Sequence, residues 1–147
     1  MSIFRCAACG RINRINPARA SDELAKCGHC KEALDATGKP QDVNASQFKR
    51  AIRNAPIPVL LDIWAPWCGP CRMVAPMLEE MGRERAGELL ILKVNSDENQ
   101  SLAQSLQISA VPSMFVFNDG KEIGRRTGAF PKANVESWLR SLGVKAK

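Results

Sequence analysis

Six cysteines, arranged in three Cys-x-x-Cys pairs, are the side chains of this chain best suited to chemistry. The pairs are Cys6 with Cys9, Cys27 with Cys30, and Cys68 with Cys71. Two thiols at this spacing can bind a metal ion together, or they can carry electrons as a dithiol and a disulfide. An even cysteine count also suits a secreted disulfide framework, but that class expects a signal peptide and irregular spacings, and we see neither. The pattern favours metal binding and redox catalysis in a reducing compartment.

The third pair follows an apolar run and opens a segment with helical period, in the order Trp67-Cys68-Gly69-Pro70-Cys71. Cys68 is expected at or just before the N-terminus of a helix, where unpaired N–H groups and the macrodipole stabilise an anion. Because the thiolate is the species that attacks disulfides, a lowered pKa makes this thiol reactive near neutral pH. Pro70 suits a first helical turn, and Gly69 lets a substrate backbone approach closely.

Two intervening residues place Cys71 about one helical turn beyond Cys68, within reach of a mixed disulfide formed there. We interpret Cys68 as the attacking thiol and Cys71 as the resolving thiol. The alternatives are half of a metal site or two buried thiols without function. Neither explains the flanking Trp67, Gly69 and Pro70.

A lone carboxylate, Asp62, lies inside the apolar run of residues 59–64. A carboxyl group among apolar neighbours resists ionisation, so its pKa rises toward the value that a general acid or base needs near pH 7. The alternative is a structural aspartate whose hydrogen bonds are satisfied at the end of a strand. Because the redox motif follows six residues later, we interpret Asp62 as the group that takes a proton from Cys71 and later returns it.

Seventeen residues separate the first two cysteine pairs, a spacing within the range of four-cysteine zinc sites. Gly10 and Gly28 supply the permissive backbone that such turns use. Four thiolates in a closed tetrahedral array select zinc or iron and favour a structural role. We therefore predict one structural zinc ion per chain, with two local disulfides or free thiols as the alternatives. The predicted ligands are Cys6, Cys9, Cys27 and Cys30.

The tetrapeptide Cys27-Gly28-His29-Cys30 also repeats the motif of protein disulfide isomerases. Those motifs follow a buried strand, whereas here the charged and mixed residues 22–26 precede the first cysteine. A second catalytic site is therefore the weaker interpretation. We expect His29 to be an exposed residue of the turn and neither a ligand nor a base.

Alternating helices and strands after residue 40 would position the redox residues. Helices are predicted over residues 45–54, 71–85, 100–106 and 132–142, and strands over residues 59–64, 89–95, 113–117 and 122–127. A tight turn at residues 118–120 predicts that the last two strands pair antiparallel. This order gives an α/β fold, a mixed sheet with helices on both faces. Pro76 should kink the second helix.

The 147 residues accommodate one ordinary domain and a small appendage. Residues 1–39 show no sustained apolar period and require a staple to fold, so we predict a zinc-binding module over 1–40 and a catalytic domain over 41–147. No run of about 18 apolar residues predicts a membrane span, so no membrane partner is expected. The net charge of +6 is shared equally by the two parts, without a run of adjacent charges in front, which disfavours nucleic-acid binding.

The run V-L-L-D-I-W-A-P-W-C-G-P-C-R at residues 59–72 resembles the signature of the thioredoxin family. The resemblance extends through Lys93, Pro112, residues 118–120 and Gly128. It implies the thioredoxin fold and a reductase of protein disulfides, acting on disulfide-containing client proteins, recycled by thioredoxin reductase and needing no organic cofactor. It also implies a cis peptide before Pro112, with Lys93 near Asp62. The implied substrate-binding residues are Trp67, Gly69, Pro70, Val111, Pro112 and Gly128.

The front cysteines are similar to those of the thioredoxin 2 type within this family, in which a zinc-ribbon-like module precedes the catalytic domain. This resemblance implies a cytoplasmic location. Ser113 and Arg72 depart from the commoner Thr and Lys, and Tyr is absent from the chain, but no catalytic group is lost. Two other functions stay open, a zinc-regulated redox chaperone or adaptor that docks clients, and an oxidant that donates disulfides. The Gly69-Pro70 dipeptide favours the reductant.

Overall fold

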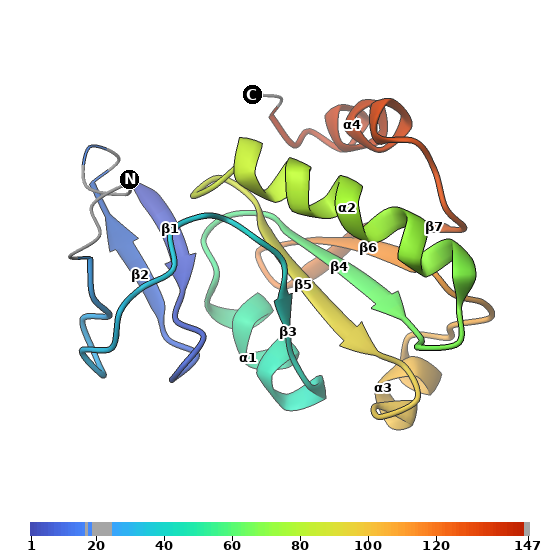
Figure 1. The fold of residues 1–147 in the computed structure, drawn as a ribbon, viewed down its shortest axis with the longest axis horizontal. Helices are drawn as coiled ribbons and strands as arrows, with labels where there is room; N and C mark the ends of the chain where they lie inside the picture. The colour runs from blue at the N-terminus through green and yellow to red at the C-terminus, as the bar shows by residue number, and fades with distance from the viewer. Residues whose placement is uncertain (17, 19–24, 146–147) are drawn as a thin grey trace.

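The chain forms two sheets, a small one near the N-terminus and a larger one that carries the rest of the fold (Figure 1). The computed structural model describes residues 1–16, 18 and 25–145. In the small sheet, β1 (Ser2–Arg5) pairs antiparallel with β2 (Ile12–Ile15). The larger sheet has the order β3-β5-β4-β6-β7. Its strands are β3 (Gln41–Asp42), β4 (Val59–Trp64), β5 (Leu90–Asn95), β6 (Ser113–Asn118) and β7 (Lys121–Thr127).

Parallel pairing joins β3, β5 and β4, whereas β6 and β7 run antiparallel at the other side of the sheet. The helices α1 (Ala45–Asn54) and α3 (Gln100–Ser105) cover one face. The helices α2 (Gly69–Glu84) and α4 (Lys132–Ser141) cover the other (Figure 1). The predicted mixed sheet with helices on both faces is confirmed.

Side chains alternate between two apolar clusters along the central strand β4. Leu61 and Ile63 pack in the cluster beneath α1 and α3, and Leu60 packs in the cluster beneath α2 and α4. Because both faces are covered, the strand is apolar at nearly every position, as its sequence indicated. Asp62 is the exception, a carboxyl group inside an otherwise apolar strand.

The predicted elements after residue 40 are confirmed with small differences at their ends. The helix α2 begins two residues before its predicted start, because Cys68 caps it and Pro70 fits its first turn. It continues through Pro76 without ending there. Three short strands were missed by the periodicity argument: β1 and β2, which pair with each other, and the two-residue β3. Strands of two to four residues carry too few positions for a period to be recognised.

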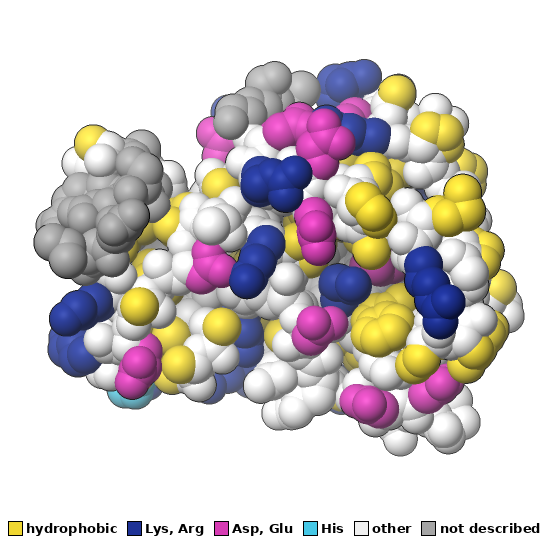
Figure 2. Space-filling model, viewed as in Figure 1, with side chains coloured by type: hydrophobic (Ala, Val, Ile, Leu, Met, Phe, Trp, Pro, Cys, Tyr) yellow, Lys and Arg dark blue, Asp and Glu magenta, His cyan; other side chains and the backbone are white. Residues whose placement is uncertain are grey.

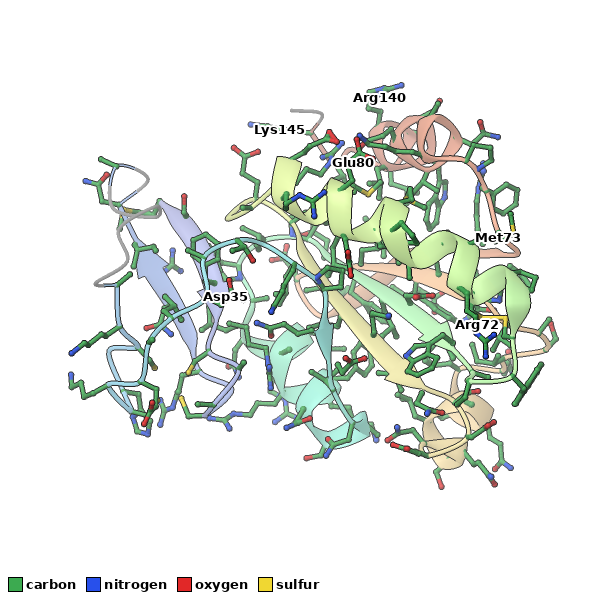
Figure 3. The ribbon with its side chains drawn as sticks, viewed as in Figure 1. Asp35, Arg72, Met73, Glu80, Arg140 and Lys145 are labelled. Carbon is green, nitrogen blue, oxygen red and sulfur yellow. A yellow bond between two sulfur atoms is a disulfide. The ribbon has the colours of Figure 1, made fainter. Side chains whose placement is uncertain are left out.

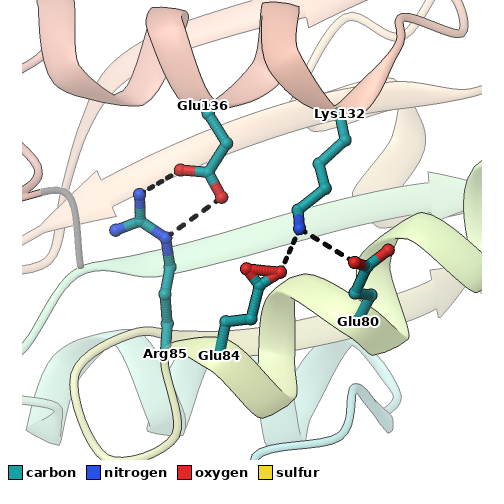
Figure 4. A network of polar contacts seen from close by, with 5 residues as sticks. All are labelled: Glu80, Glu84, Arg85, Lys132 and Glu136. Carbon is teal, nitrogen blue, oxygen red and sulfur yellow. Dashed lines mark hydrogen bonds and ion pairs between the residues drawn. The ribbon is translucent and has the colours of Figure 1, made fainter.

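Ion pairs fasten α4 to α2 (Figure 4). Arg85, whose side chain is buried just after α2, pairs with Glu136 of α4 and also donates to the carbonyl oxygen of Lys145. Lys132, at the start of α4, contacts the carboxylates of Glu80 and Glu84. These ion pairs hold α4 against α2, and the two helices together cover the apolar cluster on this face of the sheet. Among the described residues, no helix combines the length and apolarity needed to cross a membrane.

The front segment contacts the larger domain along several short stretches. The backbone N–H of Ile3 donates to the carbonyl of Gly87 at 3.0 Å. Arg5 and Gln41 exchange two hydrogen bonds, each of 2.9 Å, and Ile12 packs against the apolar cluster beneath α1. These contacts hold the small sheet against the domain at the end far from the N-terminus of α2 (Figure 1).

Two glycines let the connecting segment cross α2. A side chain on Gly38, whose φ is +82°, would overlap the carbonyl oxygen of Gly82 in the last turns of the helix. A side chain on Gly82 would overlap the carbonyl oxygen of Gly38 in return. The two backbones therefore touch at a point where neither residue has room for a Cβ atom.

Candidate redox site and metal centre

Cys68 and Cys71 form a disulfide at the N-terminus of α2. Cys68 is the N-cap residue, and its Sγ accepts a hydrogen bond of 3.1 Å from the backbone N–H of Cys71. Both sulfurs are buried beside Ala65, with Trp64 and Val111 packed against them. The predicted position at the start of a helix is confirmed, so the helix dipole and a backbone donor both act on the Cys68 sulfur.

Asp62 lies in β4 beneath the disulfide, with 1% of its surface exposed. Burial raises the pKa of its carboxyl group to about 7, and this outweighs the opposite effect of the Lys93 ammonium; Asp42 adds to the rise. Lys93 is the direct neighbour of Asp62 across the β4–β5 pairing, as the family resemblance implied. The Oδ1 atom of Asp62 accepts no hydrogen bond from the described residues. This oxygen therefore lacks the hydrogen bond that a purely structural buried aspartate is expected to accept.

A cavity of about 110 Å³ joins the acid to the disulfide. Its lining includes Asp62 and Lys93 of the sheet and Cys71 and Arg72 of α2. Because a volume of this size holds at least one water molecule between polar groups, a proton can pass between Cys71 and Asp62 without a direct contact. The guanidinium of Arg72 donates to the carbonyl of Pro66 at 2.8 Å, which places this charge over the cavity.

Exposed apolar groups surround the disulfide at the surface. Trp67 is 70% exposed and Met73 is also exposed, and both flank the start of α2. Figure 3 shows that Arg72 and Met73 lie at the N-terminal end of this helix, and Figure 2 shows hydrophobic side chains gathered at the same end of the molecule. A hollow of about 350 Å³ lies between Trp67, Val111 and α3. The surface next to Cys68 can therefore receive an extended polypeptide.

The peptide bond between Val111 and Pro112 is cis, as the family resemblance implied. The backbone N–H of Gly128 donates to the carbonyl of Pro112 at 2.8 Å, and the φ of Gly128 is +111°. These contacts bring the Pro112 and Gly128 segments together beside the disulfide. Ser113 keeps a hydroxyl contact within this loop, donating to the carbonyl of Ala110 at 2.6 Å. Ser113, which stands where Thr is commoner, therefore still forms a side-chain hydrogen bond within this loop.

The structure adds two contacts that the sequence did not indicate. The indole N–H of Trp67 donates to Asp97 Oδ2 at 3.1 Å, which fixes the exposed ring at the rim of the site. The Lys93 ammonium lies 5.3 Å from the centre of the Trp64 ring, a cation–π contact beside the buried acid. No local motif marks Asp97, because it approaches Trp67 only through the turn after β5.

The four front cysteines converge on one point, and each has a free thiol. Their sulfurs all lie within 4.8 Å of one another, with Cys6 to Cys30 at 3.7 Å and Cys9 to Cys27 at 3.6 Å. A tetrahedral metal–thiolate site with bonds of about 2.3 Å separates its sulfurs by about 3.8 Å, so the four residues fit such an ion. Both short sulfur–sulfur distances run between the two Cys-x-x-Cys pairs, whereas local disulfides would join the cysteines within each pair.

Two equivalent turns present these sulfurs. The N–H of Gly10 donates to the carbonyl of Cys6 at 2.8 Å, and the N–H of Lys31 donates to that of Cys27 at 3.0 Å. Gly10 and Lys31 adopt the left-handed conformation, with φ values of 81° and 68°. Gly28, which was expected to supply the permissive backbone of the second turn, does not adopt it. Gly28 instead donates its N–H to the side chain of Asn13 at 2.9 Å.

Hydrogen bonds favour the ionised form of one of these thiols. The N–H of Cys30, followed by the side-chain amide of Asn13, lowers the pKa of Cys27. His29 is exposed and contributes only its backbone N–H, as predicted. Residues 22–24, on which the contrast with disulfide isomerases partly depended, lie outside the described residues. Of the two described residues in that argument, Ala25 accepts a hydrogen bond of 3.0 Å from the N–H of Leu34, and Lys26 forms an isolated bridge to Ala33, so neither lies in a strand.

Residues 39–141 match the family model described as thioredoxin. A thioredoxin 1 from Synechococcus elongatus is 41% identical over 97 residues, which are 66% of this chain and 91% of that protein. Thioredoxin C-3 from Corynebacterium nephridii is 31% identical over 137 residues, 93% of this chain and 92% of that protein, so its alignment extends into the front segment. The structure of a mutant thioredoxin from Halobacterium salinarum NRC-1 has a TM-score of 0.67 at 25% identity, covering 76% of this chain and 96% of that one.

Proposed function

Because the chain belongs to the thioredoxin family, we propose that it reduces disulfides of client proteins through Cys68 and Cys71 and is recycled by a thioredoxin reductase. It is a thiol-disulfide oxidoreductase of the protein-disulfide reductase type. The observation that supports the assignment of roles is the disulfide at the N-terminus of α2, whose Cys71 lines the same cavity as the buried carboxyl group of Asp62. No organic cofactor is required, because electrons pass between sulfur atoms.

In the first step, the reduced Cys68 thiolate attacks one sulfur of a client disulfide. A new S–S bond joins Cys68 to the client, and the other client sulfur leaves as a thiolate that takes up a proton. The N–H of Cys71 and the helix N-terminus stabilise the negative charge on Cys68 before the attack. Its position as the N-cap residue therefore supports Cys68 as the nucleophile.

In the second step, Cys71 attacks the Cys68 sulfur and releases the second client thiolate, which is protonated. Two electrons have then moved from the Cys68–Cys71 dithiol to the client, and the protein holds its own disulfide. Cys71 must lose its proton for this attack, and Asp62 is the acceptor that we assign. A carboxyl group with a pKa of about 7 can accept and return a proton near neutral pH.

Client binding uses the surface beside the disulfide. We assign Trp67, Gly69 and Pro70 to one side of an extended client segment, and the Val111–Pro112 and Gly128 segments to the other. The exposed ring of Trp67 and the hollow of about 350 Å³ support this placement. The N–H and C=O groups of Val111 would pair with the client backbone in the manner of an added strand.

Residues 1–40 form a separate zinc-binding module in this proposal, and residues 41–147 form the catalytic domain. Cys6, Cys9, Cys27 and Cys30 would hold one zinc ion, and four thiolates leave no open position for a substrate. When bound, the ion supplies folding energy to the module. The cytoplasm, where thiols stay reduced, is the compartment that suits both the free thiolates and a reducing enzyme.

Turnover of insulin with a thioredoxin reductase and its reductant tests the proposal. Reduction that depends on both cysteines supports it, whereas a protein that only docks clients gives no thiol-dependent turnover. Equilibration with glutathione then separates a reductant from an oxidant. A reductant has a potential near the family value of about −270 mV, and an oxidant lies far above it.

A further inference from the structure

A second pocket lies where the front segment meets α1, at the end of the molecule far from the disulfide. It measures about 270 Å³. Arg11 and Arg14 of the front segment line one side, and Arg50 and Asn54 of α1 line the other. Nothing in disulfide reduction uses these residues, because the chemistry takes place at the N-terminus of α2.

The lining is cationic. Its described residues include three arginines, all exposed to solvent at their ends, and no acidic side chain. A fourth guanidinium lies directly behind the wall, since a Cβ atom on Gly10 would be 3.4 Å from Arg5 and 3.5 Å from Arg50. Arg5 is 4% exposed, and its Nε has no hydrogen-bond partner among the described residues. Like charges this close repel one another, and an anion bound in the pocket would reduce that repulsion.

The donors suit a phosphate group. Guanidinium groups present paired N–H donors that match the oxygens of phosphate, and an amide such as that of Asn54 adds a neutral donor. The pocket is a hollow and not a strip along the surface, and no aromatic ring is among its described lining residues. Single-stranded nucleic acids need both a groove and stacking rings, so a small ligand fits better.

We propose that this pocket binds the phosphate group of a small phosphorylated compound. Its two walls come from different parts of the chain, so the ligand contacts the front segment and the catalytic domain at once. Arg50 already joins them, because its Nη1 donates to the carbonyl of Cys9 at 3.3 Å. A bound phosphate adds further bonds across the same junction and stabilises the docked arrangement.

Titration of the full-length zinc-loaded protein with ribose 5-phosphate, followed by amide and guanidinium NMR signals, tests the proposal. Saturable shifts are expected at Arg11, Arg14, Arg50 and Asn54, on both sides of the junction. Ribose, which lacks the phosphate, should cause none. Arg50→Gln and Arg14→Gln should each weaken binding by about tenfold, because each removes a charge-assisted hydrogen bond.

The matched control is Arg53→Gln, which removes an exposed arginine from the same helix but outside the pocket. It should change the dissociation constant by less than about twofold, as expected for a screened charge. Equal weakening by Arg53→Gln and Arg50→Gln, or shifts spread over the whole surface, would overturn the proposal. Tighter binding of a twelve-residue oligothymidine than of ribose 5-phosphate at these residues would overturn it in favour of nucleic acid. Unchanged signals elsewhere in each variant show that the fold is intact.

Discussion

Cysteine pairs with the same spacing occur at both ends of this molecule, in opposite surroundings. In α2 the second cysteine of the pair lies inside a helix, and its sulfur is bonded to the sulfur of the first. In the front segment each pair closes a tight turn, and its sulfurs approach those of the other pair. The spacing alone therefore does not decide between redox exchange and metal binding. The backbone that follows the first cysteine decides it.

The two regions also differ in what keeps them folded. The catalytic domain buries two apolar clusters, one on each face of its sheet. The buried members of the front cluster are Phe4, Cys6, Cys27 and Leu34, so half of them are cysteines. With so little apolar core, the front segment is expected to depend on the proposed metal ion for its fold, whereas the domain has its own core. Four experiments can break or sharpen this contrast.

The largest effect is expected at the redox pair. Cys68→Ser should abolish insulin reduction, because it removes the thiolate that attacks. Cys71→Ser should also abolish turnover but accumulate mixed disulfides with clients, which mass spectrometry detects. Equal trapping by both variants would contradict the assigned roles. Metal content should stay at one zinc per chain in either variant, which serves as the control.

The next largest effect is the loss of the front module. Cys9→Ser or a chelator should remove the ion and unfold residues 1–40, since metal binding supplies about 10 kcal/mol or more in such sites. Native mass spectrometry measures the metal, and NMR measures the order of β1 and β2. Insulin reduction should stay within about twofold of wild type, because the domain keeps its own core. A metal-free chain with an ordered front segment would contradict the contrast.

A smaller effect is expected from Asp62→Asn. The folded-state pKa of about 7 lies above the unfolded value near 3.8, so the contribution of Asp62 to wild-type stability is greatest below pH 4 and is lost as pH rises through 7. The amide that replaces this carboxyl group in the variant has no proton to lose in this pH range. Relative to wild type, the free energy of unfolding of the variant should therefore rise by about 4 kcal/mol between pH 4 and pH 8, as measured by urea unfolding.

Reduction by the Asp62→Asn variant should also slow, by at least about tenfold at pH 7, because Cys71 loses its proton acceptor. Full activity from pH 6 to pH 8 would mean that Asp62 is only structural. Asp119→Asn is the matched control. It removes an exposed carboxylate from the turn between β6 and β7 that neither lines the cavity nor shifts the pKa of Asp62.

The smallest effect concerns the junction. Gln41→Ala removes two hydrogen bonds to Arg5 and should weaken docking of the front segment by about 2 kcal/mol. Hydrogen exchange at β1 should become faster, while zinc content and insulin reduction stay unchanged. Gln47→Ala, on the outside of α1, is the control for the loss of an amide that does not touch the front segment. Unfolding of the catalytic domain by Gln41→Ala would show that the two regions are not separable.

The sequence predicted the catalytic domain better than the front segment. The run from Val59 to Trp64 is apolar because both faces of β4 are covered, and this pattern marks a central strand wherever it occurs. Cys68 and Pro70 carry the signals of a helix start, so the position of the redox pair followed from local rules. The β1–β2 sheet gave no such signal, since strands of four residues carry too few positions for a period to be recognised.

Contacts between distant parts of the chain were also beyond local rules. Asp97 reaches Trp67 across thirty positions of sequence, and Arg5 meets Gln41 across thirty-six. Lys31 adopts a left-handed conformation that its residue type does not favour, because the turn at Cys27 imposes it. Only the assembled structure fixes such geometry. The convergence of the four front cysteines was predictable, because the spacing within each pair is local.

The crossing of Gly38 over Gly82 sets a condition for transplanting the front module. A chimera that joins residues 1–40 to another catalytic domain needs a glycine in the last turns of the helix that corresponds to α2, as well as at the connector. With alanine at either point, the connector is lifted from the helix surface, and the reciprocal bonds between Arg5 and Gln41 cannot form in register. Modular exchange in this architecture is thus limited by one backbone crossing and not by the metal site.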